Sequence, residues 1–273
     1  MIILQASLNN KILAITRKDI YASEFSQLVS SEGGKTISLP AIDIVPKDPI
    51  IVEEFINIMN KKKHDYCAFM SSQAVNVLFD LAGKINKTEN VISALNCRSI
   101  IAVGPKTRQS LINHGIAVKM VPERYSSDGL VDLFSKMDRI KGKRIIIPRS
   151  GASKEFVRKS LSDLGMIVDE LFLYNLRTSQ TNSIWKDFTL LLEQKRIDAI
   201  IFTSASTVES FFEIMQKLSY NTHSMLKAVK AVIAIGPFTN EELTKRNIRS
   251  LESKEHTVKG TFELAKVVLA ENE

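Results

Sequence analysis

Short apolar runs rich in β-branched residues alternate along this chain with longer stretches in which apolar residues recur every three or four positions. The short runs are typical of buried strands, and the longer stretches, such as 156–164, place their apolar residues on one face of a helix. Each interval between two runs is long enough to hold a helix, so the pattern predicts parallel sheets covered by helices, a doubly wound α/β fold. The predicted strands are Ile12–Thr16, Cys67–Met70, Ile100–Val103, Ile145–Pro148, Ile200–Thr203 and Val232–Ile235.

The chain also contains a tandem repeat. Four blocks of the sequence recur in the same order, with a nearly constant offset between the copies. Chance similarity would rarely preserve both the order and the spacing of four blocks. The repeat therefore predicts two related domains, in agreement with a length of 273 residues. The aligned blocks are 65–79 with 198–212, 99–107 with 231–239, 126–129 with 257–260, and 143–149 with 11–17.

Two equivalent strands lead directly into the motif Gly-Pro-x-Thr. In each copy the glycine, Gly104 or Gly236, permits a tight turn, and the proline after it suits the first position of a helix. The threonines Thr107 and Thr239 follow in the first helical turn. The free N–H groups and the dipole of such a helix start attract anions, so both motifs are candidate substrate-binding sites.

A second pair of strand-to-helix junctions is rich in hydroxyl groups. It comprises Ser71 and Ser72 in one copy and Ser204, Ala205 and Ser206 in the other. The same residues would also serve as ordinary helix caps, and this alternative stays open for each junction taken singly. Four such helix starts at the carboxyl edges of strands, where open α/β sheets bind ligands, favour an anion-binding cleft.

A third type of anion site is predicted at residues 148–154. Arg149 ends a strand, Ser150 and Gly151 form a small-residue turn, and Lys154 would add a second cation. The segment matches neither a GxxxxGK[ST] loop nor a GxGxxG fingerprint, so it gives little support to nucleotide binding.

Composition limits the classes of molecule that the chain is expected to bind. A formal charge of +7 and a pI near 9.3 favour a polyanion, which could be nucleic acid, an anionic surface or a small molecule with many carboxylates. The 37 Lys and Arg residues are dispersed and aromatic residues make up 7%, which argues against nucleic acid. With no apolar run of about 20 residues and no signal-peptide pattern, we expect a cytoplasmic protein that does not bind a membrane.

The candidate metal ligands give little support to a metal site or a cofactor. No carboxylate or cysteine lies at ligand spacing from any of the four histidines, which we expect at the surface or at helix ends. The two cysteines are expected as buried free thiols. The residues concerned are His64, His114, His223, His256, Cys67 and Cys97.

From Lys11 to about Val268 the chain resembles the uroporphyrinogen-III synthase family. No single motif is specific to this family, and the resemblance depends on the order and spacing of the motifs. The residues that carry the resemblance are Phe202–Val208, Ala234–Thr239, Glu255–Gly260, and Leu173–Tyr174 ahead of Arg177–Thr178.

The resemblance implies a division into two flavodoxin- or Rossmann-like domains that differs from a simple cut between the repeats. Domain 1 would be discontinuous, comprising residues 1–37 and 176–273, and domain 2 would comprise residues 40–173. Two extended linkers, about 35–46 and 169–178, would join them and form a hinge beside the cleft.

The resemblance also implies a hydro-lyase that cyclises hydroxymethylbilane to uroporphyrinogen III. The substrate loses water and its last pyrrole ring is inverted, whereas the uncatalysed reaction gives isomer I. Eight substrate carboxylates would explain the basic composition, no cofactor is implied, and a monomer is expected. The alternative is a non-catalytic two-domain sensor of a small anion or tetrapyrrole.

Tyr174 matches the tyrosine of the family's second linker, which the resemblance implies as the proton donor to the departing hydroxyl group. An interdomain packing role is the alternative for this residue. Thr107 and Thr239 match hydroxyl positions in the family's cleft. The family often has a further hydroxyl residue just before Thr239, where this chain has Phe238.

Overall fold

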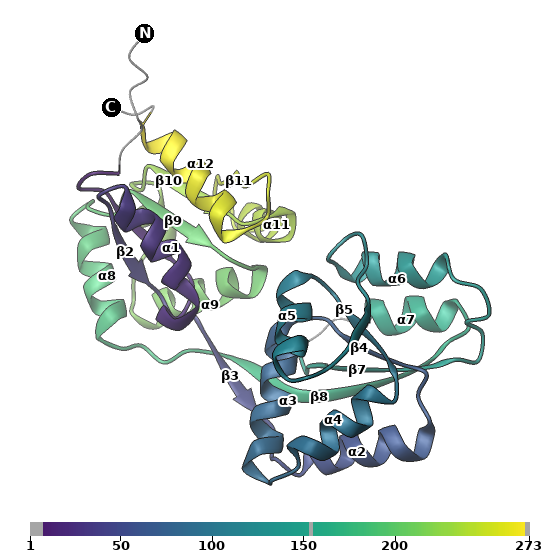
Figure 1. The fold of residues 1–273 in the computed structure, drawn as a ribbon. Coiled ribbons are helices and arrows are strands. Elements are labelled where there is room, and N and C mark those ends of the chain that lie inside the picture. The colour runs from purple at the N-terminus through teal and green to yellow at the C-terminus, as the bar shows by residue number, and fades with distance from the viewer. Residues whose placement is uncertain (1–7, 153–154, 271–273) are drawn as a thin grey trace. The chain divides into compact units, whose positions relative to one another are not determined.

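The computed structural model describes residues 8–152 and 155–270. The chain forms two compact units, each with its own sheet (Figure 1). Unit 1 comprises the residues up to Asp43 and those from Arg177 onward, and unit 2 comprises Ile44–Leu176.

The sheet of unit 1 has five parallel strands in the order β11-β10-β9-β1-β2. Leu13 of β1 pairs with Thr36 of β2 on one side and with Ala199 of β9 on the other. The strands are β1 (Ile12–Ile15), β2 (Lys35–Ser38), β9 (Ala199–Phe202), β10 (Ala231–Ala234) and β11 (Leu251–Glu252).

Both faces of this sheet are buried, which explains why its central strands are continuous apolar runs. Leu13 and Ile15 of β1 pack in the cluster that contains residues of α1 and α12, while Ile12 and Ala14 pack with α8, α9, α10 and α11. Figure 1 shows α1 and α12 together on one side of the sheet. The helices are α1 (Asp19–Ser31), α8 (Ser183–Glu193), α9 (Ala205–Lys217), α10 (Thr222–Leu226), α11 (Pro237–Lys245) and α12 (Val258–Ala270).

The sheet of unit 2 has the order β3-β8-β7-β4-β5-β6, and β8, β7, β4, β5 and β6 run parallel. At its edge the Lys47 N–H donates to the Leu173 carbonyl oxygen over 2.8 Å. The strands are β3 (Ile42–Pro46), β4 (Tyr66–Phe69), β5 (Ser99–Ala102), β6 (Val118–Met120), β7 (Arg144–Ser150) and β8 (Ile167–Thr178).

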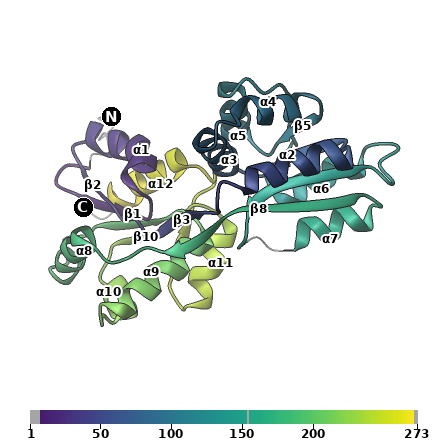
Figure 2. The ribbon, with the colours of Figure 1, turned by 90° about the horizontal axis from the view of Figure 1, so that it is seen from below.

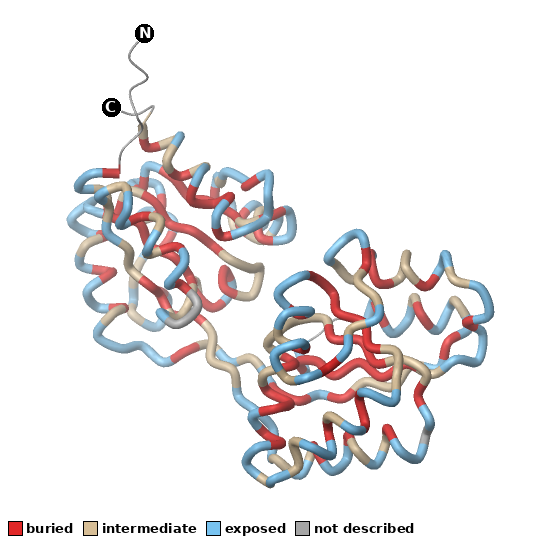
Figure 3. The backbone as a smooth tube through the Cα atoms, viewed as in Figure 1, coloured by how far each residue is buried: buried red, intermediate tan, exposed pale blue. Residues whose placement is uncertain are grey.

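Helices again cover two faces, and the buried red segments in Figure 3 follow the strands between them. One apolar cluster joins the sheet to α2, α3, α4 and α5, and the other joins it to α6 and α7. Figure 2 shows α2 and α7 on opposite sides of β8. The helices are α2 (Ile51–Lys62), α3 (Ser72–Lys84), α4 (Thr88–Asn96), α5 (Pro105–Asn113), α6 (Ser127–Ser135) and α7 (Phe156–Asp163).

The two sheets share one spatial order. The order β8-β7-β4-β5-β6 in unit 2 corresponds to β2-β1-β9-β10-β11 in unit 1, as the aligned blocks of the sequence require. In both sheets the chain reverses its direction of winding between two central strands, β7 and β4 or β1 and β9. The doubly wound α/β fold is therefore confirmed, and these two reversal points are where open sheets bind ligands.

Two expectations about single residues are wrong. Cys97 is exposed because it lies directly after the last turn of α4, whereas Cys67, inside β4, is buried as expected. His64 is buried, and its Nε2 lies 2.9 Å from Oδ2 of Asp169, a partner 105 positions away in the sequence. Only the pairing of the two chain segments reveals this contact.

Candidate active site

The predicted site residues gather at the carboxyl ends of the strands, on or beside the reversal point of each sheet. Lys154 lies outside the described residues. Unit 2 contributes Ser71, Ser72, Gly104, Thr107, Arg149, Ser150, Gly151 and Tyr174, and unit 1 contributes Ser204, Ala205, Ser206, Gly236 and Thr239.

A β-bulge sets the direction of the Tyr174 side chain. Arg149 of β7 pairs with Phe172 of β8, but the next residue, Ser150, pairs with Tyr174, so Leu173 is inserted in the ladder. Successive strand residues point to opposite faces, and one extra residue reverses that alternation. Tyr174 consequently packs in the cluster of α2 to α5, together with Leu173.

This position brings the phenol to the start of α3. Tyr174 is 6% exposed, and its hydroxyl group lies beside the Ser71 side chain. Burial raises the pKa of Tyr174, and the nearby Ser71 hydroxyl and the charge of Arg149 only partly oppose this effect. The phenol therefore holds its proton at neutral pH and can act as an acid.

Ser71 has two roles at once. Its Oγ accepts a hydrogen bond of 3.3 Å from the Ala74 N–H, so Ser71 caps α3, as the capping alternative predicts. The same side chain contacts Tyr174. The positive end of the α3 dipole thus lies close to the phenol oxygen, where it stabilises negative charge.

Arg149 is not the open cationic donor that the sequence suggested. Its Nη1 lies 2.7 Å from Oε1 of Glu170, and the two side chains are 9% and 11% exposed. Its Nε has no hydrogen-bond partner among the described residues. Arg149 is therefore largely neutralised by Glu170 and acts on Tyr174 through its field rather than through contact.

Ser150 and Gly151 hold the end of β8 in place. The Gly151 N–H donates to the Tyr174 carbonyl oxygen over 2.8 Å, and the Ser150 Oγ accepts from the Ala152 N–H at 3.2 Å. A Cβ on Gly151 would clash with Oδ1 of Asn175. These backbone contacts position Tyr174 and favour a structural role for the two residues.

Gly104 and Thr107 begin α5 as the motif predicts. Gly104 is the N-cap of α5 with φ of 106°, a conformation that strains residues with a Cβ, and Pro105 is the first helical residue. Thr107 is buried, and its hydroxyl donates to the Val103 carbonyl oxygen over 3.3 Å. The Thr107 hydroxyl is therefore engaged inside the protein.

Substituting Gly104 with alanine is expected to lower the free energy of unfolding by about 1–3 kcal/mol, because alanine must adopt a strained positive φ. The control is Gly83→Ala, inside α3, where an added Cβ meets no atom within 4 Å. That change should stabilise the helix by about 0.5–1 kcal/mol. Urea denaturation of both variants tests the difference, and equal effects of the two changes would contradict it.

In unit 1 a threonine network joins the ends of β1 and β9. Thr16 Oγ1 donates to the Ile201 carbonyl oxygen at 3.2 Å, accepts from the Thr203 N–H at 3.1 Å, and lies 3.1 Å from Thr207 Oγ1. Ser204 and Thr207 form a capping box at the start of α9, and Ser204 Oγ lies 3.1 Å from Ser206 Oγ. Sequence reasoning missed Thr16, whose partners lie 185 or more positions away.

Thr16→Val should lower the free energy of unfolding by about 1–3 kcal/mol, since the Thr203 N–H loses its buried acceptor. The control is Thr244→Val, which removes an exposed hydrogen bond from Thr244 Oγ1 to the Asn240 carbonyl oxygen. This change should lower the free energy of unfolding much less. Thermal unfolding of the two variants measures the contrast. A Thr16→Val protein as stable as the control variant would contradict the network.

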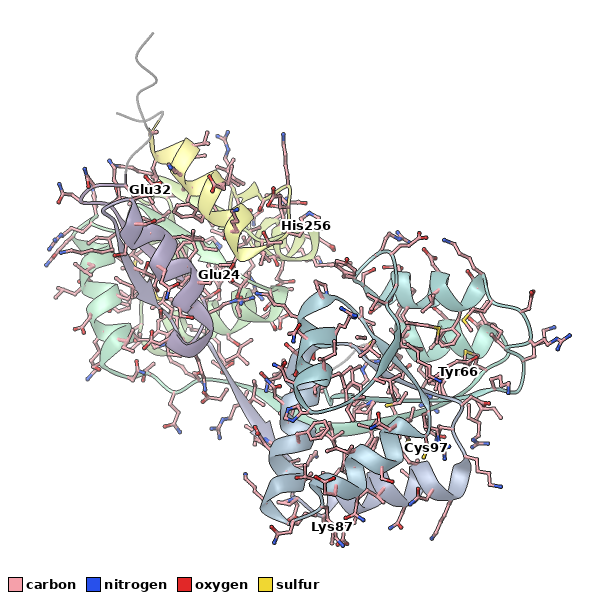
Figure 4. The ribbon with its side chains drawn as sticks, viewed as in Figure 1. Glu24, Glu32, Tyr66, Lys87, Cys97 and His256 are labelled. Carbon is pink, nitrogen blue, oxygen red and sulfur yellow. The ribbon has the colours of Figure 1, made fainter. Side chains whose placement is uncertain are left out.

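Arg17, which follows β1, is a second residue that sequence reasoning missed. It is half-buried, and burial lowers its pKa, while the charge of Glu24 on α1 (Figure 4) acts in the opposite direction. The guanidinium stays charged at neutral pH. The aligned blocks pair Arg17 with Arg149, so the repeat could have identified it as a candidate anion-binding residue.

Gly236 and Thr239 begin α11 in the way that Gly104 and Thr107 begin α5. Gly236 is extended, with φ of −176°, so its backbone needs no glycine, but a Cβ there would lie 3.3 Å from the His256 ring. Thr239 is buried, and Phe238 beside it is 68% exposed. Pro237 has no N–H, and the Thr239 N–H donates to the Gly236 carbonyl oxygen over 3.1 Å, so few N–H groups of this first turn remain for an anion.

Within 8–152 and 155–270, no group of three or more His, Cys, Asp or Glu residues could hold a metal ion. None of the helices in the same ranges is long and apolar enough to cross a membrane.

Comparisons with known proteins agree with this architecture. The uroporphyrinogen-III synthase of Synechococcus elongatus is 27% identical over 256 residues, covering 92% of each chain. A crystal structure of a mutant uroporphyrinogen III synthase from Thermus thermophilus has a TM-score of 0.62 at 16% identity, covering 96% of this chain and all of that one. The Helicobacter pylori uroporphyrinogen-III synthetase has a TM-score of 0.62 at 17% identity, covering 94% of this chain and 99% of the other.

At these low identities the two solved structures establish the fold alone. The family assignment comes from the sequence, because the model of the family described as uroporphyrinogen-III synthase HemD matches residues 23–263. This match does not favour the sensor alternative. The chain therefore belongs to the uroporphyrinogen-III synthase family, whose members are hydro-lyases that act on a tetrapyrrole.

Proposed function

We propose that this chain converts hydroxymethylbilane into uroporphyrinogen III, with the carboxyl edges of its sheets as the substrate-binding surfaces and Tyr174 as the proton donor. The observation that carries the assignment of Tyr174 is the bulge in β8, which turns a protonated phenol towards Ser71 at the start of α3. Bulges often redirect side chains next to active sites.

The chemistry needs one acid and a defined substrate geometry. Tyr174 donates its proton to the hydroxyl group on the first ring, the C–O bond breaks, and water leaves. The last pyrrole attacks the resulting methylene through its substituted carbon to form a spiro intermediate, which opens and closes again to isomer III. The proton that the new ring loses restores the phenol. Holding the chain in one folded geometry supplies the larger part of the rate.

The transient negative charge on Tyr174 would be stabilised by groups already in place. The Ser71 hydroxyl group lies beside the phenol and would donate to a phenolate oxygen, the α3 dipole points its positive end towards it, and Arg149 adds a favourable field. Because these groups are fixed by capping and by the Glu170 ion pair, they need little reorganisation when the proton leaves.

The substrate carboxylates would bind to backbone N–H groups and to one cation. The starts of α3, α5, α9 and α11 all follow strand ends, and Arg17 lies at the end of β1. The Gly-Pro motifs would contribute the positive ends of the α5 and α11 dipoles rather than threonine hydroxyls, since Thr107 and Thr239 are buried.

The test is the isomer composition of the product. Hydroxymethylbilane made enzymatically is incubated with the purified chain, oxidised and separated by chromatography into isomers I and III. Isomer III should predominate with the chain, and isomer I should predominate with heat-denatured chain. Isomer I alone in both samples would overturn the proposal.

We also propose that the chain acts as a monomer in the cytosol, without a nucleic-acid partner. The two free cysteines, one of them exposed, suit a reducing compartment. Size-exclusion chromatography with light scattering should give the mass of one chain, 30.6 kDa. A mass of twice that value at micromolar concentration would contradict the monomer.

A further inference from the structure

Two exposed rings occupy equivalent positions in the two copies of the repeat. Tyr125 and His256 each directly precede a hydroxyl residue that caps a helix, and these caps belong to the aligned blocks 126–129 and 257–260. Ser126 Oγ accepts from the Gly129 N–H at 3.1 Å, and Thr257 Oγ1 accepts from the Gly260 N–H at 2.9 Å. The repeat has therefore kept a ring beside the start of α6 and of α12.

Each ring also lies beside the glycine of a Gly-Pro motif. A Cβ on Gly104 would lie 3.5 Å from the Tyr125 Cβ and 3.7 Å from its Cγ. A Cβ on Gly236 would lie 3.3 Å from both Cγ and Cδ2 of His256. Each ring is thus held at the carboxyl edge of its own sheet, next to the first turn of α5 or α11.

The segments that carry the two rings pack closely against the helix starts. A Cβ on Gly129 would clash with the Arg124 carbonyl oxygen, and one on Gly260 would lie 2.7 Å from Ser253 Oγ. Glycine at these positions lets the segment before each helix pack directly against the helix start. Both rings are therefore carried by closely packed backbone, although they differ in chemistry.

Both rings are nevertheless exposed. Tyr125 is 63% exposed and the His256 side chain is 54% exposed. Figure 4 labels His256. Neither contacts another aromatic ring within the described part of the chain. The polar neighbour of His256 is Glu252, whose Oε1 lies 3.5 Å from Nε2. One exposed ring is common on a protein surface, but two at repeat-related positions beside ligand-binding edges suggest a shared use.

We propose that Tyr125 and His256 are stacking platforms for pyrrole rings of the substrate, each on its own unit. This inference rests on the proposed function, because hydroxymethylbilane supplies flat aromatic rings that carry carboxylates. A pyrrole stacked on either side chain places its carboxylates near the positive end of the α5 or α11 dipole. The side-chain ring would then bind the pyrrole ring of one substrate unit, and the helix start would bind the carboxylates of the same unit.

The test is steady-state kinetics of Tyr125→Ala and His256→Ala with hydroxymethylbilane. Loss of one stacking contact should raise KM about three- to tenfold. The turnover number should change less than KM, because neither ring lies on the reacting atoms. Tyr125→Phe and His256→Phe keep a flat ring and should recover most of the lost affinity.

Ile112→Ala is the matched control, because Ile112 is an exposed apolar residue near the end of α5, away from the helix start. The inference is overturned if both alanine variants keep the wild-type KM, or if the control raises KM as much as they do. Formation of isomer III by the wild-type chain in the same experiment separates failure of the inference from failure of the proposed function.

Discussion

Tyr174→Phe is expected to lower the turnover number for isomer III at least about tenfold, with KM changed less than about twofold. Phenylalanine fills the same space in the cluster of α2 to α5 but cannot donate a proton to the leaving hydroxyl group. The stability cost should be about 1 kcal/mol or less, because the packing is kept and the polar neighbour of the lost hydroxyl group is the Ser71 side chain. Initial rates of isomer III formation, corrected for spontaneous isomer I, measure the effect.

Tyr66→Phe is the control for this prediction. Tyr66 is a half-buried tyrosine at the opposite, amino end of the same sheet (Figure 4). It should keep the wild-type turnover number. A folded Tyr174→Phe protein with unchanged turnover would rule out the proton-donor role and leave Tyr174 as a packing residue.

Glu170→Ala is expected to have the largest effect on stability, lowering the free energy of unfolding of unit 2 by about 3–5 kcal/mol. The change leaves the Arg149 guanidinium buried without its carboxylate partner. Urea denaturation followed by circular dichroism measures the loss. The double variant Arg149→Met with Glu170→Met removes both charges and should recover most of the stability.

The exposed pair of Glu241 and Lys245 on α11 provides the control. Glu241→Gln should change stability little, because exposed ion pairs are screened by water. If Glu170→Ala were as mild as this control, the buried pair would not contribute to the stability of unit 2.

The central strands could be predicted from the sequence because both of their faces are buried, which leaves an uninterrupted apolar run such as Ile12–Ile15. The residues of β2, β3 and β8 were expected mainly as extended linkers, and the edge strands β6 and β11 escaped prediction altogether. Strands β6 and β11 are only three and two residues long and partly exposed, so they carry no comparable pattern. Hydrophobic periodicity alone could not show which strand ends correspond between the two units. The repeat showed this correspondence without any knowledge of strand pairing.

Only those features of the candidate site that depend on neighbouring residues in the sequence could be predicted. The Gly-Pro helix starts and the hydroxyl caps are encoded by neighbouring residues, so they appear where the sequence suggested. The direction of Tyr174 depends on a register shift between β7 and β8, and the partner of Arg149 lies 21 positions away. Such features follow from strand pairing, which a single sequence does not specify.

The central claim is that the carboxyl edges of both sheets bind a polycarboxylate tetrapyrrole. The direct measurement is the set of backbone amide shifts in a TROSY NMR titration of the chain with reduced uroporphyrinogen III. The largest shifts should occur in the first turns of α3, α5, α9 and α11 and at Arg17, while the amino edges, such as Asp65 and Asp198, should stay unchanged. Shifts concentrated at the amino edges, or none at saturating product, would contradict the claim.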